Sequence, residues 1–332
     1  MTFDQTHWVP VQQRRPLPTF YYHEHFIEML DFVAQHYAHV FEDRHVQFVE
    51  DFRRLPREAQ CLYVRLVNRK GRVFARNRLR YPELGDPGPL LTELAEQDWI
   101  ALPDANHFDE VIGFLTRAEL YAVVLPRYAG VSRSLKKKEL LDFVRQNIPA
   151  ATFMEELDSQ RILVQRRYDD VRYLMFLYFG RVREGLSQFT MRDLGLVRTR
   201  ESRDTYEPRF GDREEALEHY YFATRLRVAE KADEWQIGLL SAECEEWPEP
   251  NFPGSAALRD DLAFKLGRAA EKGNDKDLAL RLYARGESAK CSERTMRLML
   301  AGDDRDAAQR YLERCIDDPR SDEEWLVARD LY

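Results

Sequence analysis

The chain has 332 residues, of which 44% are hydrophobic and 33% are charged. This size allows two or three domains with a core each. No run of about 18 apolar residues is present, and residues 1–17 lack the apolar segment of a signal peptide. The sequence therefore predicts a protein of the cytoplasm, or of the nucleus in a cell that has one, with no membrane partner.

The net charge and the cysteines exclude two simple classes of protein. The formal net charge is -8, whereas a protein that coats nucleic acid is basic overall. If this chain binds DNA, it must do so through local positive patches. None of the cysteines stands in a C-x-x-C pair, so neither a zinc site nor a disulfide framework is expected. We predict four buried, reduced thiols: Cys61, Cys244, Cys291 and Cys315.

The N-terminal part of the chain is predicted to be helical. Apolar residues recur at three- and four-residue steps, which places them on one helix face. They are Phe26, Leu30, Val33 and Tyr37. A second helix is predicted over residues 42–54, and Pro56 is expected to open a third, since proline is tolerated in a first turn.

The third helix leads into the most basic stretch of the chain, residues 61–81, which contains no acid. If the helix continues through Gly71, four arginines at three- and four-residue steps form one positive stripe: Arg65, Arg69, Arg72 and Arg76. The alternative is an ordinary solvated helix face. The candidate phosphate contacts of this stretch are Arg65, Arg69, Lys70, Arg72, Arg76, Arg78 and Arg80.

Two further short helices, at residues 116–125 and 136–146, are joined by a connection that contains Gly130. With lysines at the start of the second helix, this pattern looks like a SAP module. Helix-start amides and adjacent lysines suit a phosphate, and such a module holds the DNA backbone without reading bases. The alternative is a solvated lysine run. The candidate contacts are Arg133, Lys136, Lys137 and Lys138.

The middle of the chain is mixed in character. Residues 171–178 form a dense apolar and aromatic run, for which core packing is favoured over stacking on bases. Residues 188–196 are predicted to form a short helix that ends at a glycine. We expect a small winged-helix-like insertion near residues 160–200, followed by a long helical stretch over residues 212–245.

The last third of the chain contains a repeat. Residues 273–281 align with residues 302–310, and a helix precedes each copy. Each unit is therefore a helix, a tight glycine turn and a helix, which is the form of tetratricopeptide-like hairpins. Arginines of these hairpins either line a concave DNA surface or are plain surface charge: Arg281, Arg285, Arg294 and Arg297.

The final helix, which begins at Asp322, is predicted to need a covering partner. The end of a helical solenoid needs a polar cap, and this helix carries Trp325, Leu326 and Leu331 instead. We therefore expect a further domain to pack after Tyr332.

In this order, the segments resemble the Fanconi-associated nuclease family, and their compact layout is similar to that of its bacterial members. The resemblance lies in residues 61–66, 69–71, 78–84, the SAP-like stretch, and residues 174–180, 186–189 and 192–196, followed by the hairpins. It implies a mostly α chain with four parts: an N-terminal helical basic domain (1–88), a SAP-like module (89–150), a mixed linker or winged-helix-like segment (151–211) and an incomplete helical repeat domain (212–332).

The resemblance also implies a function. Family members cut the 5′ flap side of branched DNA in interstrand crosslink repair, through a C-terminal VRR-NUC domain. The signature of that domain is a Glu, a Pro-Asp and a Glu-x-Lys, whose carboxylates hold the Mg²⁺ or Mn²⁺ that activates water. Pro103-Asp104 is present here, but no Glu-x-Lys follows it. We therefore expect no catalytic residue and no metal ligand in these residues, and Mg²⁺ or Mn²⁺ only in a nuclease domain beyond Tyr332.

The predicted role of the chain is to bind and position branched or 5′ flap DNA at the nucleoid for that nuclease. Whether the chain itself is an enzyme stays open. Two alternatives remain: a non-catalytic DNA-binding scaffold, and a helical-repeat module that binds proteins and has no DNA role. No phosphate-binding loop, nucleophile elbow or dinucleotide glycine motif is present to favour another enzyme class.

Overall fold

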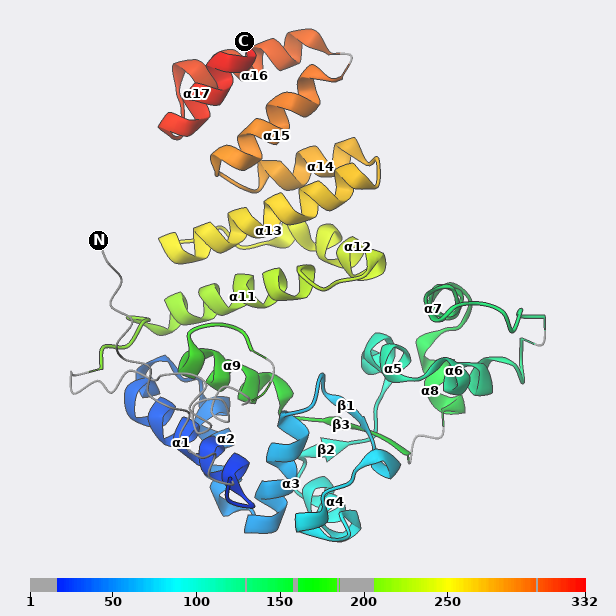
Figure 1. The fold of residues 1–332 in the computed structure, drawn as a ribbon. Helices are drawn as coiled ribbons and strands as arrows, with labels where there is room; N and C mark the ends of the chain where they lie inside the picture. Colours follow the sequence, from blue (N-terminus) through cyan, green and yellow to red (C-terminus); the bar gives the residue numbers. More distant parts are fainter. Residues whose placement is uncertain (1–16, 129, 158–160, 184, 186–205, 303) are drawn as a thin grey trace, which may run out of the picture. The chain divides into compact units, whose positions relative to one another are not determined.

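The structure is a computed structural model that describes residues 17–128, 130–157, 161–183, 185, 206–302 and 304–332 (Figure 1). The chain is mostly helical, as predicted, and forms two compact units. Unit 1 comprises residues 1–178 and 183–207, and unit 2 comprises residues 179–182 and 208–332. No helix in the described part is long and apolar enough to cross a membrane.

One part of unit 1 is a helical bundle around an aromatic core. Trp99 is fully buried at its centre, with its ring 4.7 Å from that of Tyr63 and 5.3 Å from that of Phe48. The guanidinium of Arg167 lies 4.4 Å from the Trp99 ring. The helices are α1 (Tyr21–His36), α2 (Asp43–Arg54), α3 (Arg57–Val67), α4 (Gly88–Glu96) and α9 (Tyr168–Phe179).

The first three predicted helices are confirmed, and so is the apolar face of the first. Phe26, Leu30 and Val33 are fully buried on α1, and Tyr37 is buried directly after it. The predicted core packing of residues 171–178 is also confirmed, because most of this run is buried on one helix, α9. The predicted helix over residues 188–196 lies outside the described residues.

A three-stranded antiparallel sheet joins segments that are far apart in the sequence. The strands are β1 (Val73–Ala75), β2 (Ile100–Ala101) and β3 (Ile162–Gln165), in the order β1-β3-β2. Phe74 pairs with Leu163, and Ile100 pairs with Gln165. The described part of the expected winged-helix-like segment therefore supplies the central strand of a sheet whose other strands come from residues 73–101.

The prediction that the third helix continues through Gly71 is wrong. Helix α3 ends at Val67, and Gly71 has a φ of +77°, a left-handed conformation that favours glycine. Strand β1 begins two residues later, and its three side chains are all buried. The four arginines at helical spacing therefore do not form a stripe on one helix.

The second part of unit 1 is a small helical lobe. Its helices are α5 (Phe108–Phe114), α6 (Arg117–Val124), α7 (Lys137–Asn147) and α8 (Ala150–Glu156). Helices α6 and α7 are the two predicted ones, whereas α5 and α8 were not predicted; at seven residues each, they show too few turns for a periodic pattern. Val73 and Ala75 of β1 share one hydrophobic core with Leu120 and Leu140 of this lobe, so the basic stretch and the lysine helix have a common scaffold.

Short 3-10 helices connect these elements. They are η1 (Ala38–Val40), η2 (Arg76–Arg78), η3 (Pro82–Leu84) and η4 (Ala105–His107) in unit 1, and η6 (Glu243–Glu246) in unit 2.

Unit 2 is a stack of helices. They are α11 (Arg213–Ala229), α12 (Glu234–Ala242), α13 (Pro253–Lys272), α14 (Lys276–Ala284), α15 (Ala289–Leu300), α16 (Arg305–Asp317) and α17 (Asp322–Leu331). The long helical stretch predicted over residues 212–245 is divided into two helices. The second one begins because the Asp233 side chain accepts a hydrogen bond from the backbone of Gln236 at 2.8 Å.

The predicted helix, glycine turn and helix units are present at both copies of the repeat. Asp275 caps α14 through the backbone N–H of Leu278 at 3.0 Å, and Asp304 caps α16 through the N–H of Ala307 at 2.9 Å. The two caps stand at equivalent positions of the repeat, so the sequence similarity encodes the same turn twice. All four cysteines of the chain are buried and unpaired, as predicted.

Candidate nucleic-acid interface

Two basic blocks of the sequence converge at the turn between α5 and α6 in unit 1. From one side, an Arg78 Nη2 lies 2.5 Å from Oε1 of Glu119, and the Arg78 guanidinium lies 5.1 Å from the centre of the Phe114 ring. From the other side, Nζ of Lys137 donates a hydrogen bond to the carbonyl of Gly113 at 2.7 Å. The residues after β1 and the start of α7 therefore meet around residues 113–119.

The connection between α6 and α7 is also attached to this turn. The Tyr121 hydroxyl donates to the carbonyls of Ser132 and Leu135, at 2.8 Å and 3.3 Å. Nη1 of Arg117 lies 3.5 Å from the same Leu135 carbonyl. These contacts fix the position of the backbone that precedes the lysines of α7.

Glu119 organises the centre of the convergence. Its carboxylate accepts hydrogen bonds from the backbone and the hydroxyl of Thr116, at 2.8 Å and 2.7 Å, which completes a capping box at the start of α6. Burial opposes ionisation of this carboxyl, but the hydrogen bonds from Thr116 and the ion pair with Arg78 prevail and lower the pKa of Glu119 to about 2.

The lowered pKa predicts a pH-dependent contribution of Glu119 to stability. A folded-state pKa below the ordinary value of 4.5 stabilises the fold above pH 4.5, and this stabilisation is lost as the pH falls towards 2. Because the side chain is 37% exposed, solvent screening limits the effect, and we expect Glu119→Gln to cost about 1 kcal/mol at pH 7 through the lost cap and ion pair.

Urea unfolding of the two proteins at pH 7 and pH 3, followed by circular dichroism, measures this difference. The difference in the free energy of unfolding between wild type and Glu119→Gln should be smaller at pH 3 than at pH 7. Glu155→Gln, an exposed change on α8, is the control and should be neutral at both values. An equal loss at both pH values would contradict an ionic origin.

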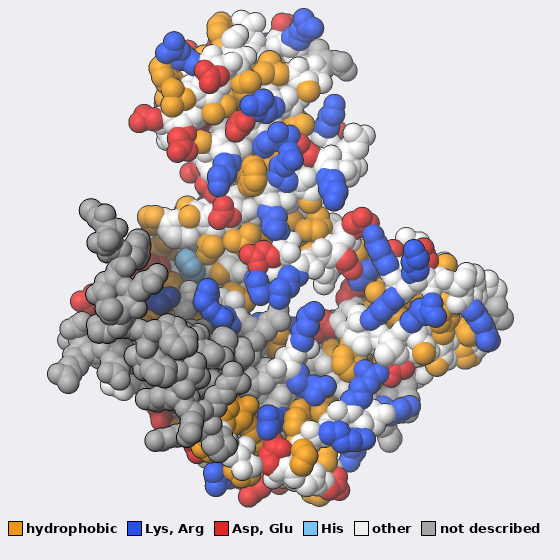
Figure 2. All heavy atoms as spheres, in the orientation of Figure 1, with side chains coloured by type: hydrophobic (Ala, Val, Ile, Leu, Met, Phe, Trp, Pro, Cys, Tyr) orange, Lys and Arg blue, Asp and Glu red, His pale blue; other side chains and the backbone are white. Residues whose placement is uncertain are grey.

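Three exposed cations on the segments that meet at this turn have no carboxylate partner in the described part of the chain. They are Arg76, Arg117 and Lys136, which we call the turn cluster. Arg76 lies on η2 beside Arg78, and Lys136 precedes Lys137 at the start of α7. Arg117 was not among the predicted contacts, although it directly follows the helix cap Thr116. In Figure 2, lysine and arginine side chains gather over the part of unit 1 that contains β1 and the α5–α7 lobe.

Other predicted contacts are exposed as well. Lys70, Arg80 and Arg133 have no carboxylate partner among the described residues, and Lys138 is exposed on α7. Burial lowers the pKa of the Lys137 ammonium below its ordinary value, against the nearby charge of Glu119. The Glu139 carboxylate accepts the backbone N–H of Lys136 at 2.7 Å, so part of the anion-binding capacity of this helix start is used by the protein itself.

The remaining predicted contacts have structural partners. Arg65 pairs with Glu83 and lies over the ring of Tyr22, which ties α3 to α1 and η3. Arg72 pairs with Glu110 at 3.0 Å. Arg69 donates to the hydroxyl of Tyr81 at 3.2 Å. For these residues the described contacts supply a role in folding, and a DNA contact stays a prediction.

In unit 2, three of the four hairpin arginines that were candidates for a concave DNA surface form ion pairs. Arg285 pairs with Glu249 at 2.9 Å, Arg297 pairs with Glu293 at 2.8 Å, and Arg294 pairs with Glu271. Arg281 is exposed. Within the described residues, no three His, Cys, Asp or Glu side chains lie together in a way that suits a metal ion, so Mg²⁺ or Mn²⁺ is not assigned to any of them.

Comparison with known proteins connects this fold with a family of nucleases. The family model "FAN1, HTH domain" matches residues 20–101, which include α1 to α4 and the first two strands. The Fanconi-associated nuclease 1 homolog of Pseudomonas aeruginosa is 27% identical over 307 residues, which cover 88% of this chain and 54% of that protein. The chain is thus similar in sequence to a Fanconi-associated nuclease over most of its length.

Further relatives and solved structures show the same similarity. The homolog of Oryza sativa subsp. japonica is 27% identical over 190 residues, which cover 53% of this chain and 20% of that protein. A crystal structure of paFAN1 bound to DNA with a two-nucleotide 5′ flap and a gap has a TM-score of 0.72 and 25% identity, over 96% of this chain and 58% of that one. A second paFAN1 structure, bound to DNA with a one-nucleotide 5′ flap and a gap, has a TM-score of 0.74 at 24% identity, over 95% of this chain and 58% of that one, and supports the fold alone. The chain thus spans about half the length of its Pseudomonas relative.

Proposed function

We propose that this chain binds branched DNA with a 5′ flap and positions it for cleavage in the repair of interstrand crosslinks. The observation that carries the proposal is the convergence of two basic blocks on one scaffold of unit 1, which leaves the turn cluster exposed and without carboxylate partners among the described residues. Support comes from the paFAN1 structure, which was solved with 5′ flap DNA and resembles nearly the whole chain.

The proposed mechanism is electrostatic positioning. Arginine and lysine side chains that contact phosphates displace condensed counterions, which gives affinity without sequence preference. In this role, α6 and α7 act as a SAP-like module that holds the backbone of one duplex arm, and the hairpins of unit 2 act as a tetratricopeptide-like support. The net charge of -8 is compatible with this role because the local field at the turn cluster, and not the average charge, acts on DNA.

Cleavage itself is assigned to other residues. We propose that metal-dependent phosphodiester hydrolysis belongs to a nuclease domain that packs against α17, where Leu326 and Tyr332 are 55% and 67% exposed. Such a domain would use carboxylates to hold Mg²⁺ or Mn²⁺ and activate water. We also propose that the protein is cytoplasmic and associated with the nucleoid.

Binding to a fluorescent 5′ flap DNA at two salt concentrations tests the DNA-binding role. If the three residues of the turn cluster each contact a phosphate, the dissociation constant should rise roughly 40-fold between about 50 and 200 mM salt. The same duplex without a flap is the control ligand for the contribution of the flap. Absence of binding at the lower salt concentration would refute the proposal.

The second candidate is a protein-interaction module. Its support is a groove of about 1060 Å³ in unit 2, lined by apolar residues such as Leu226 and Phe264 and by charged residues of α13. A chain that fails to bind DNA at low salt but captures a peptide in this groove would favour the second candidate.

A further inference from the structure

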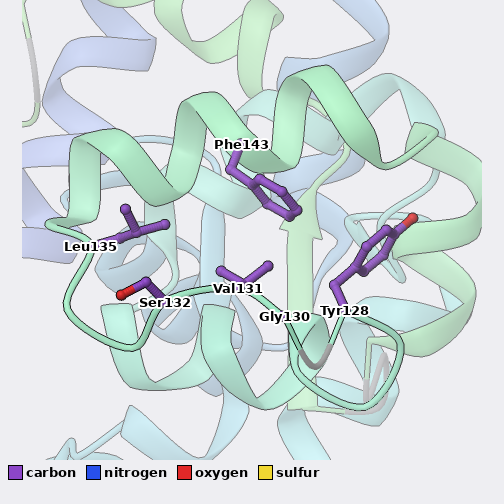
Figure 3. A pocket seen from close by; sticks show the side chains of 6 residues that line it. All are labelled: Tyr128, Gly130, Val131, Ser132, Leu135 and Phe143. Atoms are coloured by element: carbon purple, nitrogen blue, oxygen red, sulfur yellow. The ribbon is translucent and has the colours of Figure 1, made fainter.

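A small apolar hollow lies in the lobe of unit 1, between the α6–α7 connection and α7 itself. Its volume is about 430 Å³, which is within the range of roughly 300 to 1,000 Å³ typical of ligand pockets. Figure 3 shows the side chains of the connection and of α7 around a common space, with the Phe143 ring pointing from the helix towards Val131. The lining residues are Tyr128, Gly130, Val131, Ser132, Leu135 and Phe143.

Two aromatic rings form one wall of the hollow. Phe143 and Tyr128 meet edge to face, with ring centroids 5.8 Å apart and an angle of 82° between the planes. The Tyr128 hydroxyl donates to the carbonyl of Asn147 at 3.1 Å, which fixes this ring against the end of α7. A flat apolar group that enters the hollow therefore meets an aromatic surface that is already oriented.

The opposite wall is held in place as well. The Tyr121 hydroxyl binds the carbonyls of Ser132 and Leu135, and the Ser132 and Ser134 hydroxyls lie 2.8 Å apart. Val131 and Leu135 pack against the buried core of the lobe. These contacts lie within the lobe itself and hold the walls of the hollow in place, which reduces the entropic cost of binding.

Two exposed cations stand next to lining residues of the hollow in the chain, and we call them the rim. Arg133 and Lys136 directly follow the lining residues Ser132 and Leu135, so their backbones lie about 3.8 Å from the wall. Both are exposed, and neither pairs with a carboxylate in the described part of the chain. An aromatic wall beside exposed cations is the combination with which proteins bind single-stranded nucleic acid, since the base stacks and the phosphate meets the cation. An apolar peptide would use the hollow but not the rim.

We propose that this hollow receives one unpaired base of the flap strand, while Arg133 and Lys136 hold the phosphates beside it. The inference rests on the proposed function and deepens it, because it assigns a subsite for the single strand that shares Lys136 with the turn cluster. Every base has a π-face, so the subsite accepts any base. It makes the chain distinguish a flap from a plain duplex end.

The test uses the 332-residue chain and flap DNA that carries 2-aminopurine, a fluorescent base quenched by stacking, at successive flap positions. Binding should quench the probe at one position. Val131→Phe, which fills the hollow, and Phe143→Leu, which removes one of its two aromatic rings but stays apolar, should each reduce the quenching. Loss of one stacked base should weaken flap binding by roughly 5- to 150-fold. Binding of the flapless duplex should be unchanged.

Val46→Phe is the matched control, because Val46 is 45% exposed on α2 and distant in the fold from this lobe. Circular dichroism checks that each variant is folded. If Val131→Phe does not fold, Phe143→Leu alone tests the subsite. If wild type binds the duplex and the flap but the probe is never quenched and both variants bind like wild type, the subsite is refuted while the DNA-binding role stands. If wild type binds neither DNA, the proposed function itself fails.

Discussion

A chain without the turn cluster is expected to bind 5′ flap DNA at least about 10-fold more weakly than wild type at low salt, because each cation that is removed takes one phosphate interaction with it. The variant replaces Arg76, Arg117 and Lys136 by alanine. All three side chains are exposed, so their removal should leave the core of the lobe intact. The salt dependence should also become flatter, by about one logarithmic unit of slope for each phosphate that is no longer neutralised.

A charge-matched control separates this local effect from a change in net charge. Arg53, Arg54 and Arg166 are also exposed, at 49%, 66% and 45%, but each pairs with an acid. Their replacement by alanine removes the same three positive charges from unit 1. Fluorescence anisotropy measures DNA binding at several salt concentrations. For this control, the affinity should fall with salt as steeply as it does for wild type. Equal weakening by both triple variants would mean that average charge, and not the turn cluster, governs binding.

The helices of the chain were largely predictable because their signals are local. Apolar residues at helical spacing identified α1, and the repeated glycine turns identified the hairpins of unit 2. Each of these signals lies within a short segment of the chain, and tertiary packing did not override it. The helical break at Lys231 was missed because good helix-forming residues surround it, and only the Asp233 cap marks it.

The prediction failed where a short strand replaced a helix. Residues 65–76 have arginines at helical spacing, but Val73, Phe74 and Ala75 are a β-compatible run that pairs with a strand about ninety residues away in the sequence. Pairing over such a separation leaves no local trace, and propensity is a weak guide when tertiary contacts decide. Gly71, in the left-handed region, is the one local sign that the helix ends.

The candidate site was predictable as a set of basic blocks but not as a surface. The sequence identifies Lys136 and Arg76 as candidates, yet sixty residues separate them, and nothing in either block indicates that the two segments meet at the same turn. The contacts that bring them together, from Arg78 to Glu119 and from Lys137 to Gly113, are long-range. The same contacts explain why Arg78 is a positioning residue: it holds the cap of α6 and is only in part available to DNA.

The largest effect on stability is expected from adding one methyl group at Gly267. A Cβ atom there would lie 2.7 Å from Cζ of Tyr283. The ring cannot withdraw, because it is 1% exposed and its hydroxyl donates to Glu271 at 2.5 Å. Since α13 and α14 pack through this glycine, Gly267→Ala must push the two helices of the hairpin apart, at a cost of roughly 1 to 3 kcal/mol.

The control for this prediction is Gly238→Ala. Gly238 also lies inside a helix of unit 2, but no atom lies within 4 Å of its added Cβ, so alanine should stabilise α12 by about 0.5 to 1 kcal/mol through backbone entropy alone. Thermal unfolding of both variants should therefore give shifts of opposite sign. If Gly267→Ala is as stable as wild type, the close approach of α13 and α14 is not a constraint on the hairpin. Retention of flap binding by this variant would further show that unit 1 binds DNA independently of the packing of that hairpin.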